Sequence, residues 1–192
     1  MCLKILTLTL LAGTIFPCVA YDGNWWISST KERRLGFLAG YTDCSVDDAG
    51  QKQLANISWY VLEPRITAFV ESNKSNLKMS VAQLIAAVAR PQAADPNDKY
   101  AQHFPGKHGF FDGEYWRMSY PDHRAGFVEG YLDCYRSLIR TNNSFSRPAR
   151  LYAQDISKWY GVSDSDPGEI NSQRTDVKIA DVLLRFRDPG RH

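Results

Sequence analysis

DGNWWISSTKERRLGFLAGYTDC, residues 22–44, recurs as DGEYWRMSYPDHRAGFVEGYLDC at residues 112–134, and this duplication decides the fold. The two segments align without a gap at an offset of 90, and 11 of their 23 positions are identical. Ordinary residue frequencies would give roughly one or two matches by chance. The identical positions are Asp22, Gly23, Trp26, Ser29, Arg34, Gly36, Phe37, Gly40, Tyr41, Asp43 and Cys44 in the first copy, and Asp112, Gly113, Trp116, Ser119, Arg124, Gly126, Phe127, Gly130, Tyr131, Asp133 and Cys134 in the second.

A weaker similarity extends the duplication toward the C-terminus. Residues 81–84 (VAQL) resemble residues 179–182 (IADV) at an offset of 98, so the second copy holds extra residues. We place these in the segment 163–175, which is rich in Ser, Asp, Gly and Pro. The two copies predict helical repeat 1 at residues 21–111 and helical repeat 2 at residues 112–192.

The duplicated segment predicts a helix in each copy. Ser29 and Glu32 are spaced as a capping box, in which the serine accepts a hydrogen bond from a free backbone N–H and the glutamate reaches back. In the second copy Ser119 is the expected cap, and Pro121 falls in the first turn, where its missing N–H costs little. We expect both helices to run at least to the matched cysteines.

These helices carry two stripes. Phe37, Tyr41 and Cys44 share one face at i, i+4 and i+7, and Gly36 and Gly40 form a stripe beside them. The second copy repeats both stripes. Because glycine inside a helix costs about 1 kcal/mol relative to alanine, the four matched glycines indicate that another element packs very close to each backbone.

Two further helices are predicted in each copy. In repeat 1 they cover Ile57–Val70, with a kink or break at Pro64, and Ser80–Ala89; their counterparts lie near Pro148–Tyr160 and Thr175–Arg185. Alternating strand patterns are scarce. We therefore predict a mainly α fold of two tandem three-helix units, related by pseudo-two-fold symmetry and packed as one compact domain.

Residues 1–20 are typical of a secretory signal peptide cleaved after Ala20. The apolar stretch 5–16 is too short for a membrane anchor, which needs roughly 20 residues. A lipoprotein would use Cys18, but Pro17 fits such a site poorly. We expect a secreted or periplasmic protein with no membrane span after cleavage.

The mature chain keeps two cysteines and little net charge. Loss of one lysine takes the formal net charge from +2 to +1, which does not indicate nucleic-acid binding. Cys44 and Cys134 occupy equivalent positions, and export would expose them to an oxidising compartment. We predict that they form a disulfide near the symmetry axis, the alternative being two buried thiols.

Four matched aspartates are the candidates for chemistry. Asp22 and Asp112 fit turns that lead into the helices, although a symmetric site of paired carboxylates is an alternative. Asp43 and Asp133 fit structural ion pairs, with a ligand-binding role as the alternative. Their expected partners, because guanidinium forms forked bonds to carboxylate, are Arg34 and Arg124.

No recognised catalytic motif is present. The sequence lacks a G-x-S-x-G elbow, a glycine-rich phosphate loop and an H-E-x-x-H helix. His103, His108 and His123 lie near Asp112, but their spacing matches no metal motif, and a surface loop fits the first two better. We assign no catalytic residue, metal or cofactor.

The duplicated D-G-x-x-W … R-x-G-F-x-x-G-Y-x-D-C element resembles one in small exported bacterial proteins of unknown function. Its Phe37…Gly40-Tyr41 step, followed by the helix at residues 80–84, is also similar to the Tai/Rap immunity proteins of type VI secretion. That resemblance implies a small helical periplasmic protein that binds and blocks a toxic effector enzyme.

Three functions are compatible with these features. We expect a binding protein of the bacterial envelope, whose partner is another extracytoplasmic protein. One alternative is an enzyme using Asp22, Asp43, Asp112 or Asp133 as an acid or base, which a strongly raised carboxylate pKa in a cleft would favour. The other is a small-ligand carrier, which an apolar cavity lined by aromatic residues would favour.

Overall fold

The computed structural model of the 192-residue chain describes residues 21–45, 57–89, 110–139, 145–162 and 174–188. These residues form a compact helical body in which no strand occurs, so the mainly α prediction is confirmed. The expected signal peptide, His103, His108 and most of the extra residues of repeat 2 lie outside the described ranges.

Repeat 1 and repeat 2 each contain four α-helices within the described ranges. The elements of repeat 1 are α1 (Gly23–Ser28), α2 (Lys31–Ser45), α3 (Trp59–Ser72), the 3-10 helix η2 (Lys74–Lys78) and α4 (Val81–Val88). Those of repeat 2 are α5 (Gly113–Met118), α6 (Pro121–Ile139), α7 (Ala149–Tyr160) and α8 (Ile179–Arg185). The prediction of three helices per unit was therefore one α-helix short.

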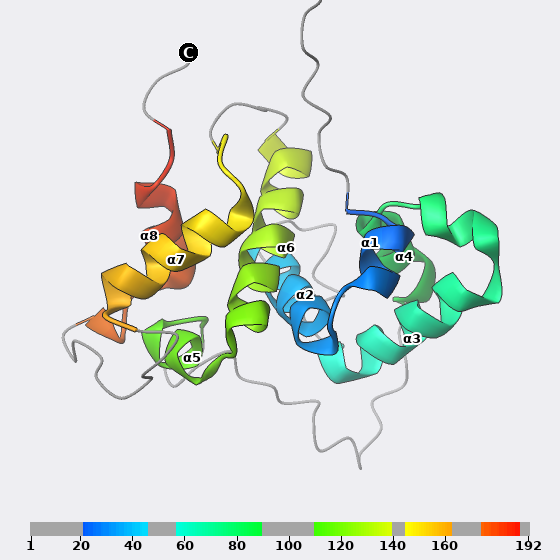
Figure 1. Cartoon of the computed structure of the whole chain (residues 1–192), viewed down its shortest axis with the longest axis horizontal. Helices are drawn as coiled ribbons and strands as arrows, with labels where there is room; N and C mark the ends of the chain where they lie inside the picture. Colours follow the sequence, from blue (N-terminus) through cyan, green and yellow to red (C-terminus); the bar gives the residue numbers. More distant parts are fainter. Residues whose placement is uncertain (1–20, 46–56, 90–109, 140–144, 163–173, 189–192) are drawn as a thin grey trace, which may run out of the picture.

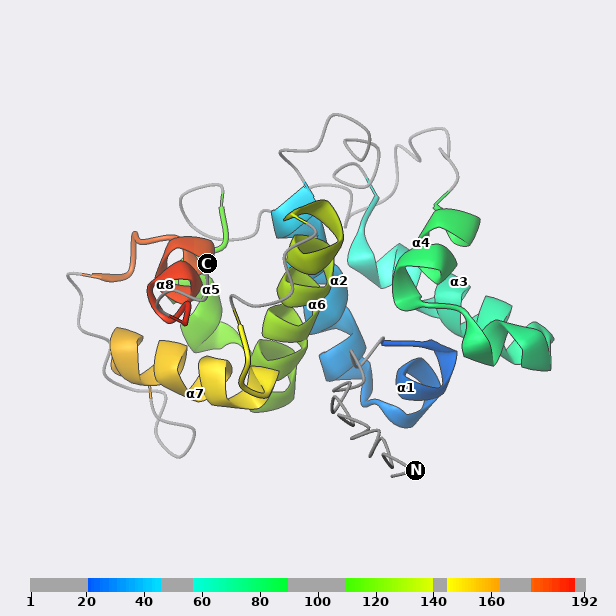
Figure 2. The same cartoon turned by 90° about the horizontal axis from the view of Figure 1, so that it is seen from above.

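The two repeats meet at their central helices. In both views α2 and α6 lie side by side, with α1, α3 and α4 on one flank and α5, α7 and α8 on the other (Figures 1 and 2). Matched backbone bridges join Asp22 to Ser80 in repeat 1 and Asp112 to Lys178 in repeat 2. Asp22 and Asp112 are 90 residues apart, and Ser80 and Lys178 are 98 apart, which are the two offsets found in the sequence. The two-fold relation itself stays a prediction.

The unpredicted helix in each repeat is the D-G-x-x-W element. The Asp22 carboxylate accepts a hydrogen bond from the Trp25 backbone N–H at 2.9 Å and so caps α1. Asp112 caps α5 through the Tyr115 N–H, also at 2.9 Å. An N-cap carboxylate satisfies one free donor and favours the helix dipole. The turn predicted at these aspartates is thus the start of a short helix.

This extra helix changes the role of the matched serines. Ser29 ends α1, where its hydroxyl donates to the Trp25 carbonyl at 2.7 Å, and Ser119 ends α5 in the same way, at 2.8 Å from the Tyr115 carbonyl. The capping box predicted at Ser29 is therefore wrong. The first turn of α2 is capped by Thr30, whose hydroxyl accepts from the Arg33 N–H at 3.2 Å.

The other predicted helices lie close to their expected bounds. Pro64 lies inside α3, which continues to Ser72 without a break. A capping box does begin α4, where the Ser80 hydroxyl accepts from the Gln83 N–H at 3.2 Å and the Gln83 amide oxygen accepts from the Ser80 N–H at 2.9 Å. The α8 helix begins four residues later than predicted, at Ile179.

Each repeat has one fully buried tryptophan in its short first helix. Trp26 is fully buried and its indole N–H donates to the Thr67 hydroxyl of α3 at 3.0 Å. Trp116 is equally buried and donates to the Ser157 hydroxyl of α7, also at 3.0 Å. Because a buried indole N–H needs an acceptor, these bonds fix the short first helix of each repeat against its third.

Candidate functional site

The matched glycines bring the backbones of α2 and α6 into direct contact. A Cβ atom at Gly36 or Gly40 would overlap the carbonyl oxygen of His123 or Phe127, respectively. The reciprocal overlaps would occur at Gly126 with Arg33, and at Gly130 with Phe37. The predicted close approach is thus confirmed, and the element that approaches each helix is its own counterpart.

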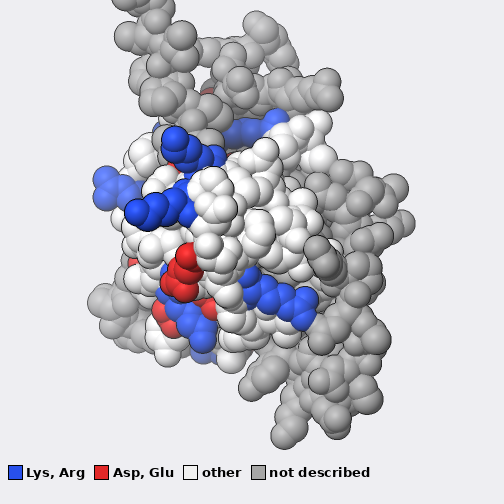
Figure 3. Space-filling view, turned by 90° about the vertical axis from the view of Figure 1, so that its right-hand side faces the viewer, with Lys and Arg blue, Asp and Glu red and all other residues white. Residues whose placement is uncertain are grey.

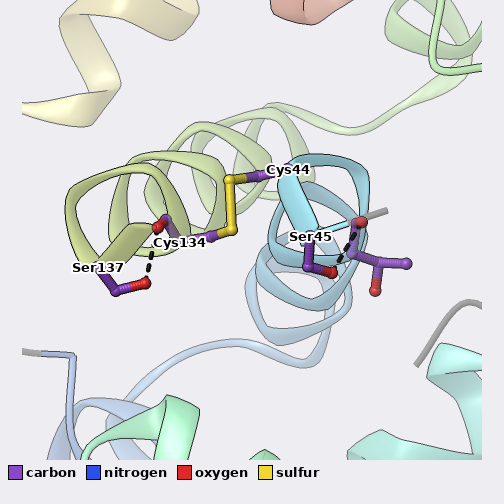
Figure 4. Close-up of a disulfide and its surroundings, with 5 residues drawn as sticks. Cys44, Ser45, Cys134 and Ser137 are labelled. Atoms are coloured by element: carbon purple, nitrogen blue, oxygen red, sulfur yellow. Dashed lines mark hydrogen bonds between the residues drawn. A yellow bond between two sulfur atoms is a disulfide. The ribbon is translucent and has the colours of Figure 1, made fainter. Parts of the chain in front are cut away.

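A disulfide closes the far end of this helix pair. Cys44 and Cys134 are bonded, with their Cα atoms 6.1 Å apart, as the sequence predicted. Figure 4 shows the bond bridging the last turns of α2 and the later part of α6. Because both helices begin at the same end, the covalent bond lies at the opposite end from Thr30 and Asp122, whose side chains hydrogen-bond at 2.8 Å.

The matched arginines support the short helices. Arg34 donates through Nη1 to the carbonyls of Trp26 at 3.2 Å and Ser29 at 3.0 Å, and through Nε to the Glu63 carboxylate at 2.8 Å. The predicted Arg34–Asp43 pair is therefore wrong. An acidic residue nearer in space, on α3, takes the place of the one on the same helix.

Arg124 holds the equivalent place in repeat 2. Its Nε donates to the Trp116 carbonyl at 2.9 Å and its Nη2 to the Arg117 carbonyl at 3.3 Å. The position that matches Glu63 at the offset of 90 is Ala153, so repeat 2 lacks this acid on its third helix. The guanidinium in both repeats serves the fold by closing the C-terminal end of a short helix.

One polar cluster crosses the repeat junction. Arg33 of α2 forms a forked ion pair with Glu129 of α6, its Nε lying 2.8 Å from one carboxylate oxygen and its Nη2 bonding the other. Burial raises the pKa of Glu129, and the bond to Arg33 opposes this rise. Burial also raises the pKa of Asp133, one turn further along α6, to about 6, against the opposing charge of Arg136.

The aromatic residues beside this cluster are packed into the core. The Tyr21 ring lies edge-on to Trp25 and Phe37, with centroids 5.1 and 5.3 Å away. Burial, followed by the charge of Glu129, raises the pKa of the Tyr21 hydroxyl. Phe37 and its counterpart Phe127 are both fully buried, so these motif positions hold the helices together.

The opposite flank of the junction carries a different pair. His123, which matches Arg33, lies 2.5 Å through Nε2 from the Tyr115 hydroxyl. Burial lowers the pKa of His123 to about 4 and raises the pKa of Tyr115 well above its ordinary value. The imidazole of His123 is therefore neutral near pH 7. Asp112, the nearby aspartate named in the sequence analysis, is used as the N-cap of α5.

Within the described residues, no group of three His, Cys, Asp or Glu side chains is placed to hold a metal ion. The helices of these same ranges include none that is long and apolar enough to cross a membrane.

The sequence did not single out the exposed apolar residues at the start of the central helices. Met118, the last residue of α5, is 73% exposed, and Tyr120, immediately before α6, is 71% exposed. Ile27, 41% exposed, lies in the last turn of α1. A comparison of the repeats could have found two of them, since the positions matching Met118 and Tyr120 are Ser28 and Thr30. We call Met118 and Tyr120, which are two residues apart in the chain, the apolar end surface.

Comparisons of the chain with family models, with curated proteins and with solved structures give no match.

Proposed function

We propose that this protein is an extracytoplasmic binding protein that recognises another protein through its apolar end surface. The observation that carries the proposal is the exposure of Met118 and Tyr120 on an otherwise well-packed body. Large apolar side chains exposed together are typical of protein-binding sites. Aromatic residues and methionine are also enriched in the buried centres of such interfaces.

The duplication supports this assignment. Ser119 performs the same structural task as Ser29, yet the residues on either side of it changed from Ser28 and Thr30 to Met118 and Tyr120. The small polar residues of repeat 1 are therefore compatible with the same local fold. The fold therefore does not require Met118 and Tyr120 to be apolar, whereas binding to a partner protein would.

Export is supported by two features. A disulfide between the repeats forms and persists in oxidising compartments. Tyr21, which would become the first residue after cleavage behind Ala20, has its ring buried against the core. N-terminal sequencing of the protein from an extracytoplasmic fraction should begin at Tyr21; a chain that still starts at Met1 there would contradict the proposed processing.

The binding proposal is tested by affinity capture with the mature chain, Tyr21–His192, from the extracytoplasmic fraction of its own organism. We expect one stoichiometric protein partner, which the M118S/Y120T variant fails to retain. This variant installs the residues of repeat 1, so the fold should be preserved. The control is Leu138→Ser, because Leu138 is 41% exposed near the opposite end of α6.

The captured partner also tests the hypothesis, taken from the resemblance to immunity proteins, that this protein inhibits an effector enzyme. If the partner is an enzyme, its activity should fall when the protein is added in equimolar amount. An active enzyme in the complex would reject the inhibitory role while keeping the binding role. Equal capture by wild type and M118S/Y120T would reject the apolar end surface as the contact.

A second candidate function is acid–base catalysis, favoured by the pKa of Asp133 near 6. A carboxyl group that titrates close to neutrality can exchange protons at physiological pH. The test is a screen of glycosidic, ester and peptide substrates with wild type and Asp133→Asn. Turnover that Asp133→Asn abolishes would support catalysis, and equal turnover by both would remove Asp133 from it.

A further inference from the structure

Trp159 of repeat 2 holds two guanidinium groups beside one indole ring. The guanidinium carbon of Arg174 lies 4.9 Å from the ring centroid and that of Arg185 lies 5.2 Å from it. Arg174 also donates through Nη1 to the Trp159 carbonyl at 2.7 Å. Cation–π contact positions both side chains, and the hydrogen bond further fixes Arg174, at the surface where both arginines are exposed.

Repeat 1 shows that the fold does not need the charge at position 174. Asn76 precedes Arg174 by 98 residues and donates from its side chain to the Phe69 carbonyl, also at 2.7 Å. Phe69 in turn precedes Trp159 by 90 residues. A neutral amide therefore makes the same structural bond, and the positive charge of Arg174 is an addition of repeat 2.

Two more cations replace neutral residues at the same offset. Ser80 caps α4 with a capping box, whereas its match Lys178 stands at the start of α8 without a side-chain cap bond. A positive charge at a helix N-terminus also opposes the helix dipole. Arg185 takes the place of Ala87. Repeat 2 thus has an exposed lysine, with its ammonium 5.2 Å from the Phe110 ring centroid, where repeat 1 has a helix-capping serine.

The corresponding end of repeat 1 differs in charge. Figure 3 faces the flank of repeat 1 and shows a broad uncharged area, with both basic and acidic residues beside it. Every residue of α4 is uncharged. Within the described residues, the two cations on the Trp159 ring are therefore a feature of repeat 2, because the matching positions of repeat 1 are Asn76 and Ala87.

The arrangement fits discrete carboxylates better than a nucleic-acid backbone. Among the described residues, neither Arg174 nor Arg185 forms an ion pair with an acidic side chain. A planar guanidinium presents a fork that matches a carboxylate. Exposed Asp176 and Asp181 lie between the three cations in the sequence and interrupt the continuous positive track that a phosphate backbone needs.

We propose that Arg174 and Arg185 on the Trp159 ring, together with Lys178 at the start of α8, form an acid-binding surface that takes a Glu- or Asp-rich segment of the protein partner. The inference rests on the proposed binding function and names the chemistry of that partner. Trp159 would pack against the aliphatic parts of the segment while the guanidinium groups bond its carboxylates.

A labelled oligoglutamate peptide is the probe, with fluorescence anisotropy as the readout. Wild type should bind it with an affinity that falls steeply as salt is raised. The variant R174N/K178S/R185A installs the residues of repeat 1 and should bind at least about tenfold more weakly, since each charged hydrogen bond contributes on the order of a factor of ten. R174K/R185K should show an intermediate loss, because lysine keeps the charge and lacks the fork.

The matched control is K31A/K74N/K78A, which removes three exposed cations from repeat 1. It should bind the peptide as wild type does. No binding by wild type, equal binding by R174N/K178S/R185A, or an equal loss in the control would each overturn the acid-binding surface. Tighter binding of a single-stranded oligonucleotide than of the peptide would overturn its specificity for carboxylates.

This test separates the surface from the proposed function. Peptide binding that depends on Arg174 and Arg185, combined with affinity captures that retain no protein, would uphold the surface and reject the binding function. A captured partner retained equally by wild type and R174N/K178S/R185A, with no peptide binding, would uphold the binding function and reject the acid-binding surface.

Discussion

Gly40 of α2 lies directly against the backbone carbonyl of Phe127 in α6, with no room for a side chain between them. Gly40→Ala should therefore destabilise the protein by roughly 2–4 kcal/mol, although alanine favours a helix by about 1 kcal/mol. The neighbour is backbone, which cannot rotate away as a flexible side chain could. Urea unfolding measures the change.

The control for this prediction is Ser137→Ala on α6, an exposed position whose hydroxyl bonds only its own helix, at the Cys134 carbonyl. It should change the unfolding free energy by no more than about 0.5 kcal/mol. A Gly40→Ala protein as stable as Ser137→Ala would contradict the close helix contact.

The Cys44–Cys134 bond joins residues 90 apart in the sequence. Replacing both cysteines by serine should lower the unfolding free energy by about 4 kcal/mol, because the unfolded chain regains the entropy of a long open loop. Reduced wild type should unfold at the same urea concentration as this variant. The direct check is thiol titration of the denatured, unreduced mature chain, in which two reactive thiols per molecule would disprove the bond.

The ion pair between Arg34 and Glu63 is largely buried, with side-chain exposures of 15% and 7%. Glu63→Ala should cost about 3–5 kcal/mol, since it leaves a buried guanidinium with an unmet charge. Asp155→Ala removes the acid from the more exposed pair with Arg147 and should cost at most about 1 kcal/mol. Chemical denaturation of both variants makes the comparison, and similar losses would mean that burial does not govern these pairs.

Much of the fold could be predicted because duplication supplies two readings of one pattern. The glycine stripes and the matched cysteines each pointed to a partner, and in both cases the partner is the equivalent helix of the other copy. When a chain contains two copies of one unit, a residue that needs a close partner often meets its own counterpart, so the contact can be inferred without knowing any distance. The helix bounds at Ser80 followed from side-chain capping, which is local in sequence.

The interactions that escaped prediction depend on distances through space. Glu63 and Glu129 have no equivalent acid in the other repeat, so comparison of the copies could not mark them as partners of Arg34 and Arg33. Ser29 was assigned to the wrong helix because a serine can begin one helix or close the previous one with similar local signals. Only the six-residue α1 helix, once seen, decides between these roles.

Asp133 and His123 should give opposite pH dependences. For His123, burial lowers the pKa from 6.5 to about 4, so the unfolded chain binds more protons between these values and stability is lost as the pH falls through this window. For Asp133, burial raises the pKa from 3.8 to about 6, so the folded chain binds the extra proton and stability is lost as the pH rises from about 4 to 6. The upward shift of the Glu129 pKa acts in the same direction as that of Asp133.

Replacing either side chain with one that does not titrate should remove that side chain's own contribution to the pH dependence of stability. Relative to wild type, Asp133→Asn should be nearly neutral near pH 4 and stabilising by roughly 1–3 kcal/mol near pH 7, because only the charged carboxylate is penalised by burial. His123→Gln loses the bond to Tyr115 at every pH, but its deficit should shrink by a similar amount between pH 7 and pH 4, since glutamine gains no proton on unfolding. Urea titrations at the two pH values measure both differences. If the difference for either variant stayed constant between pH 4 and 7, the corresponding group would titrate alike in the folded and unfolded chains, and burial of that side chain would not be what sets its charge.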